Sequence, residues 1–90
     1  MPRDEDVERR IQNAAPGELK KELMRLFELP PSRLRDGRIA RVYLELARRT
    51  QGKERERAFL AGYSYARTSR DPEARHMTER LWREFATWKR

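Results

Sequence analysis

Cysteine is absent from this 90-residue chain, which excludes disulfide bonds and thiolate metal ligands. Long apolar runs are also missing, because only 37% of the residues are hydrophobic and 41% are charged, and no run approaches the roughly 20 residues that cross a bilayer. The N-terminal residues are acidic rather than basic, so no secretory signal is predicted. We therefore expect a cytoplasmic protein that has no membrane partner.

Residues with catalytic or metal-binding chemistry are scarce. The single histidine, His76, forms a Glu-x-x-His pair with Glu73, and such a pair supplies two ligands in di-iron helical bundles. Those bundles also need a second pair and two further glutamates that point into the core, and this chain has no second copy. Glycine-rich phosphate loops and GxSxG nucleophile elbows are missing as well. We expect a non-enzymatic protein without a metal or a cofactor.

Strand patterns are missing too, since no stretch of alternating β-branched residues is long enough to suggest a sheet. Apolar residues instead recur at helical spacing almost throughout the chain. We predict an all-α fold, a single small bundle of four or five short helices with a central antiparallel helical hairpin. The predicted domain covers residues 1–90, and residues 1–15 are the part expected to fray.

Proline, glycine and capping residues set the predicted helix boundaries. The predicted helices cover about 4–14, from Pro16 to the Pro30–Pro31 pair, from Asp36 to Gly52, 53–69 and 71–89. Asp36 is the predicted cap of the third helix, and Asp71 followed by Pro72 gives the strongest helix start in the chain. Gly62 lies on the core face of the fourth helix, where a missing side chain favours the close approach of a neighbouring helix.

Positive charge is concentrated in the middle of the chain. Residues 1–30 hold six Lys/Arg against seven Asp/Glu, residues 31–70 hold eleven against four, and residues 71–90 hold five against four. Because a basic block can bind phosphates, we predict a small binding module for a polyanion, most simply RNA or DNA. The predicted nucleic-acid site lies on the hairpin and comprises Arg38, Arg41, Arg48, Arg49, Arg55 and Arg57.

The same arginines have a second interpretation as a solvated helix face. The apolar residues of the third helix fall on one side and leave Arg41, Glu45 and Arg49 on the opposite arc. Glu45 lies four residues from both arginines, a spacing at which opposite charges pair on a helix. Part of the positive charge is then neutralised locally, and the sequence leaves both interpretations open.

Aromatic residues support an alternative function, a protein-protein interaction or homodimerisation module. Trp82 lies at the margin of the apolar stripe of the last helix, Trp88 lies near its end, and Tyr65 lies off the core face of the fourth helix. Exposed aromatic side chains are typical of interface hot spots, so these three residues are the predicted partner-binding residues. In this alternative the arginine surface docks onto an acidic protein partner or onto a second copy of the chain.

Overall fold

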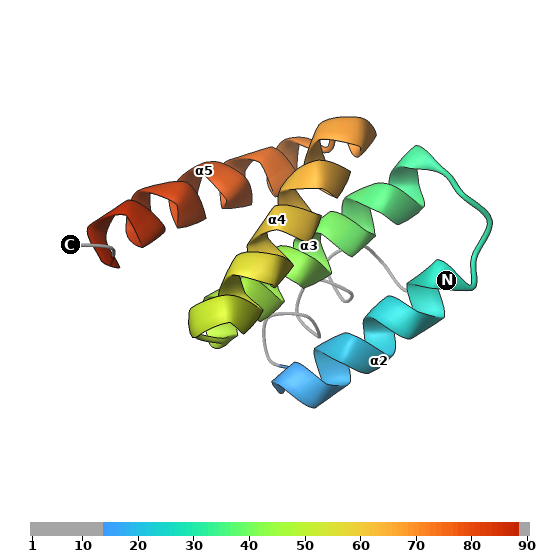
Figure 1. The fold of residues 1–90 in the computed structure, drawn as a ribbon. Helices are drawn as coiled ribbons and strands as arrows, with labels where there is room; N and C mark the ends of the chain where they lie inside the picture. Colours follow the sequence, from blue (N-terminus) through green and yellow to red (C-terminus); the bar gives the residue numbers. More distant parts are fainter. Residues whose placement is uncertain (1–13, 89–90) are drawn as a thin grey trace.

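The computed structural model describes residues 14–88, with side chains from residue 14 to residue 85. In this range the chain forms four α-helices and no strand (Figure 1), with the bounds α2 (Pro16–Phe27), α3 (Arg33–Arg49), α4 (Gly52–Ser69) and α5 (Pro72–Trp88). The prediction of an all-α bundle is confirmed, while the helix predicted over 4–14 lies outside the described residues. None of these four helices is both long and apolar enough to cross a membrane.

Helix α3 is the centre of the bundle, because it packs against α2, α4 and α5 (Figure 1). Its side chains Ile39, Val42 and Leu44 are completely buried, and Leu19 of α2 and Leu81 of α5 belong to the same core. A helix covered by three neighbours has little of its circumference left for solvent. Polar side chains of α3 are therefore drawn into the interior along with the apolar ones.

Helices α3 and α4 form the predicted antiparallel hairpin. Near the turn between them, the Arg55 Nε of α4 donates a hydrogen bond to the Ala47 carbonyl oxygen of α3 at 3.0 Å. Farther from the turn, the rings of Tyr43 and Tyr65 stack with their centroids 6.1 Å apart. Contacts therefore move back along α3 as they move forward along α4, which is the antiparallel arrangement.

Gly62 lies where the two helices approach closely, as the sequence predicts. A Cβ atom at this position would lie 2.9 Å from Leu44 Cγ and 3.2 Å from the Leu44 backbone nitrogen. Real Cβ atoms do not approach other atoms this closely, so a side chain here would push α4 away from α3. Glycine is therefore required for this packing, despite the lower helix propensity that it brings.

The start of α3 differs from the prediction. Ser32 caps the helix instead of Asp36: its backbone is extended, and its Oγ accepts a hydrogen bond from the Arg35 backbone N–H at 3.0 Å. Asp36 lies in the first turn of α3, where its Oδ1 accepts a hydrogen bond from the Arg35 Nε at 3.2 Å. The prediction was wrong because a serine directly after two prolines already supplies the capping oxygen four residues earlier.

Helix α4 is bounded by two residues with left-handed backbone. Gly52 opens it with a φ of +62°, and Arg70 follows its last residue with a φ of 56°. Asp71 then begins α5 as predicted, because its Oδ2 accepts a hydrogen bond from the Ala74 backbone N–H at 2.9 Å. The tight turn at residues 70 and 71 brings the end of α4 beside the start of α5.

Candidate functional site

Arg41, a predicted phosphate-binding residue, forms an ion pair inside the fold. Its Nε lies 3.1 Å from Asp71 Oδ2 and its Nη2 lies 3.2 Å from Asp71 Oδ1, so the contact is bidentate. The two side chains are only 11% and 19% exposed. Because Asp71 also caps α5, this pair joins the middle of α3 to the start of α5. Arg41 therefore makes a structural contact in the folded protein.

Glu45 holds two further arginines of the predicted site. The sequence placed Glu45 on a solvent-facing arc, and that placement is wrong: the residue is 3% exposed, because three helices cover α3. Its carboxylate accepts hydrogen bonds from Arg48 Nε at 3.1 Å and from Arg49 Nε at 3.0 Å. The hydrogen bond to Glu45 raises the pKa of the Arg48 guanidinium above its usual value. The two arginines thus neutralise a buried carboxylate. Arg49 is the partner that the local-pairing interpretation expects, whereas the second partner is Arg48 and not Arg41, which pairs with Asp71.

The remaining predicted arginines have three different environments. Arg55 of α4 donates a hydrogen bond to the Ala47 carbonyl of α3, and its guanidinium carbon lies 5.2 Å from the centroid of the Phe85 ring of α5. It therefore contacts both neighbouring helices. Arg38 is half-buried on α3. Arg57 is exposed on α4. Arg41, Arg48, Arg49 and Arg55 therefore make polar contacts with the protein itself, and the structure does not gather the six predicted residues into one open surface.

The outward side of α4 carries cations that the sequence reasoning largely missed. We call Lys53, Arg57, Arg67 and Arg70 the basic stripe; all four are exposed. Within the described part of the chain, no carboxylate lies within 4.0 Å of their charged nitrogens. The signal was present in the sequence, since positions 53, 57, 60, 64 and 67 follow the i, i+4, i+7 spacing of one helical arc.

An aromatic patch lies beside the basic stripe, and we define it as the exposed rings of Tyr63 and Trp82. Trp82 is 65% exposed and Tyr63 is 41% exposed. Both rings rest on the buried ring of Phe59, with centroids 6.0 Å away for Trp82 and 6.4 Å away for Tyr63. The guanidinium carbon of Arg67 lies 5.8 Å from the Tyr63 centroid, so the patch and the stripe meet at these two residues.

A groove between α4 and α5 adjoins the same residues. It has a volume of about 470 Å³ and is lined by Tyr63, Ala66, Arg67, Arg70, Asp71, Arg75, Thr78 and Glu79. Its two carboxylates already face cations, because Asp71 pairs with Arg41 and Glu79 Oε1 lies 3.5 Å from Arg75 Nε. Arg67 and Arg70 then give the groove an excess of positive charge.

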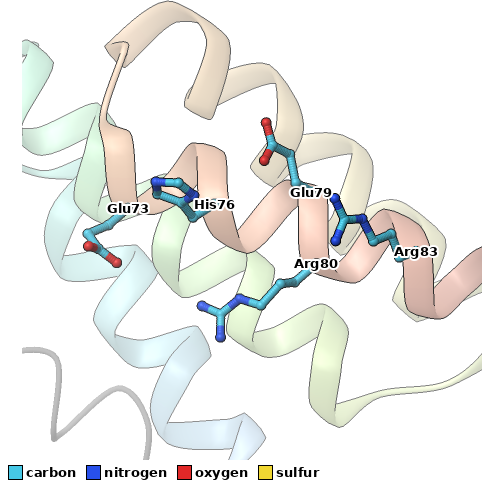
Figure 2. Close-up of a pocket in the computed structure, with 5 residues that line it drawn as sticks. All are labelled: Glu73, His76, Glu79, Arg80 and Arg83. Atoms are coloured by element: carbon cyan, nitrogen blue, oxygen red, sulfur yellow. The ribbon is translucent and has the colours of Figure 1, made fainter.

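A second hollow, of about 450 Å³, contains the Glu-x-x-His pair. Its lining residues are Glu73, His76, Glu79, Arg80 and Arg83, and Figure 2 shows that all five project from α5 alone. His76 is exposed. Among the described residues, no group of three or more His, Asp or Glu side chains is arranged to hold a metal ion. The groove between α4 and α5 has walls from two helices and is the better-formed of the two sites.

The other predicted partner-binding residues do not join the aromatic patch. Tyr65 was expected off the core face, but its ring is half-buried against the core, 6.0 Å from the Phe27 ring and 6.1 Å from the Tyr43 ring. Burial, with a smaller contribution from Tyr65, raises the pKa of Tyr43 above its ordinary value. The side chain of Trp88 lies outside the described part of the chain. Trp82 alone of the three is seen exposed.

No protein-family model matches this sequence, and no curated protein or solved structure is significantly similar to it. The candidate site is the surface formed by the basic stripe, the aromatic patch and the adjoining groove. It collects exposed cations and exposed rings on two neighbouring helices, with Arg67 and Tyr63 at their junction.

Proposed function

We propose that this protein is a small non-enzymatic module that binds a polyanion, RNA or DNA, through the basic stripe on α4. The observation that carries this proposal is the contrast between α3 and α4. Arg41, Arg48 and Arg49 of α3 neutralise Asp71 and Glu45, whereas the stripe has no carboxylate partner in the described structure. Exposed cations of this kind bind phosphates and release counterions.

The dimensions of the stripe suit a nucleic-acid backbone. Its members Lys53 and Arg67 lie on one helix, so their backbone positions are separated by about 21 Å at the rise of an α-helix. Between its cations lie Leu60 and Ser64, which carry no charge. We expect the exposed cations to contact phosphates, which every nucleic acid presents, so binding should depend little on the base sequence of a duplex.

Fluorescence anisotropy tests the proposal. Labelled duplex DNA, single-stranded DNA and structured RNA are titrated with the protein at low and near-physiological salt. The variant Arg57→Glu/Arg67→Glu should weaken binding about tenfold or more. It should also reduce the slope of log affinity against log salt concentration by about two, because two phosphate contacts are lost. The control variant Lys21→Glu/Arg80→Glu changes the net charge equally at exposed positions outside the stripe.

The control variant distinguishes binding at the basic stripe from non-specific attraction by the net positive charge of the protein. Equal losses of affinity in both variants would attribute binding to net charge and would overturn the assignment to α4. Absence of binding to all three nucleic acids at near-physiological salt would overturn the proposal itself.

A protein-interaction or homodimerisation module remains the second candidate. Leu60 and Trp82 favour it, because each is 65% exposed and large apolar side chains in the open often mark interfaces. Sedimentation over a range of concentrations tests homodimerisation. A homodimer would have a sedimentation mass of about twice the chain mass of 10.9 kDa. The Trp82→Ser variant of such a dimer should have the mass of a single chain. A single-chain mass at every concentration would exclude it.

A further inference from the structure

We propose that the aromatic patch stacks the bases of a single-stranded nucleic acid while the arginines of the neighbouring groove bind its phosphates. This inference rests on the proposed function and specifies the form of nucleic acid that the surface takes. Its occupant is a single strand whose unpaired bases reach Trp82 and Tyr63 and whose backbone follows Arg67 and Arg70.

The rings of the patch are held ready for stacking. Phe59 is 6% exposed and supports both Trp82, at an interplanar angle of 33°, and Tyr63, at 26°. Phe85 contacts the same Phe59 ring edge-on, with centroids 5.0 Å apart and an interplanar angle of 72°. Because a buried ring fixes the orientation of the exposed ones, a base that stacks on them loses less conformational entropy in the protein.

Positive charge lies where the backbone of such a strand would run. Tyr63 belongs to the aromatic patch and also lines the groove between α4 and α5 together with Arg67 and Arg70. A base stacked at the patch therefore has cations within the same surface. Aromatic rings that alternate with cations along a groove are the usual basis of single-strand binding without sequence preference.

Base stacking also distinguishes the two forms of nucleic acid. In a duplex the faces of the bases are already stacked on one another, so only unpaired bases can reach an exposed ring. The combination of open rings and adjoining arginines, with Arg67 5.8 Å from the Tyr63 ring, thus favours a single strand over a duplex. A protein partner, whose interface core would also be enriched in Trp, Tyr and Arg, predicts no preference between the two strands in the test below.

The test compares two single strands that differ only in their bases. A labelled oligothymidylate and an abasic strand of equal length are titrated at the same salt concentration. The wild-type protein should bind the oligothymidylate about 5- to 150-fold more tightly, the range expected for the loss of one stacked base. Trp82→Ala should reduce this preference, because Tyr63 alone is then left to stack, and should leave binding to the abasic strand unchanged, while Trp82→Phe should retain most of the preference.

Two controls keep the proposal testable if a variant is disturbed. Leu60→Ala removes an apolar side chain with the same 65% exposure as Trp82 but without a ring, and it should keep the preference. In Trp88→Phe, Trp82 is the only tryptophan of the chain, and its fluorescence should be quenched by the oligothymidylate and not by the abasic strand.

The outcomes separate this inference from the proposed function. Equal affinity of the wild-type protein for both strands, or an equal loss for both with Trp82→Ala, would overturn base stacking while leaving phosphate binding in place. If neither strand nor a duplex binds at near-physiological salt, both the proposed function and this inference fail.

Discussion

Asp71 holds two helices at once, because its carboxylate receives the Arg41 guanidinium of α3 and the Ala74 backbone N–H of α5. Replacing Asp71 with alanine removes the helix cap, which costs about 1 kcal/mol. It also takes the carboxylate from a guanidinium that is 11% exposed, which costs about 2–3 kcal/mol at this partial burial. The free energy of unfolding should fall by about 3–4 kcal/mol, and Tm should fall by on the order of 12–30 °C.

Urea unfolding followed by far-UV circular dichroism measures the effect in Asp71→Ala, Arg41→Met and the double variant. Because both single changes remove the same ion pair, the double variant should be destabilised by less than the two losses together, with a coupling of about 1–3 kcal/mol. The matched control is Glu79→Ala, whose pair with Arg75 has side chains 53% and 81% exposed, so its loss should stay within about 1 kcal/mol. Additive losses in the double variant, or a loss below about 1 kcal/mol in Asp71→Ala, would refute the reasoning.

Two further predictions concern packing and pH. Gly62→Ala should destabilise the protein by about 1 kcal/mol in urea unfolding, because the clash with Leu44 exceeds the gain in helix propensity. Gly17→Ala is the control and should be neutral or stabilising, because a Cβ atom there would meet no neighbouring atom within 4 Å. An equal change in stability in the two variants would contradict this reasoning. The raised pKa of Tyr43 means that the fold favours its protonated form, so stability is fully present below the ordinary pKa of 10.0 and is lost as pH rises through the folded pKa. The Tm should therefore decline as pH rises between about pH 8 and pH 11, and this decline should be shallower in Tyr43→Phe. The same decline in Tyr43→Phe would show that Tyr43 is not its cause.

Most helix ends follow from signals within a few residues. Pro16 lies in the first turn of α2, and Asp71 with Pro72 begins α5, as the sequence predicts. These signals are local because a cap bonds to an amide only two or three positions away and proline restricts its own φ. Asp36 marks the limit of such local signals. Ser32 and Asp36, four positions apart, could each have capped α3, and the extended backbone after the proline pair places Ser32 at the helix start.

The candidate site was only partly predictable, because its members come from different helices. Trp82 was expected at the edge of the core and is exposed there, and Arg57 was expected among the surface cations and is exposed on α4. Arg67, Arg70 and Tyr63 were not singled out, since their significance comes from the groove that α4 forms with α5. Helical periodicity assigns a residue to an arc, but it does not state which helix lies against that arc.

By itself, the sequence determined that this protein is a basic, all-helical chain with an arginine-rich centre, because composition and periodicity are properties of the chain before it folds. Only the tertiary structure decided which of those arginines pair with carboxylates and which stay exposed. Packing α3 beneath three helices buries Glu45 and most of Asp71, and a carboxylate taken out of water needs a cation beside it. Arg41, Arg48 and Arg49 of α3 meet that need, the first of them across 30 positions of sequence. Lys53, Arg57 and Arg67 on the outward face of α4 are exposed, and no carboxylate of the described residues lies within 4.0 Å of their charged nitrogens.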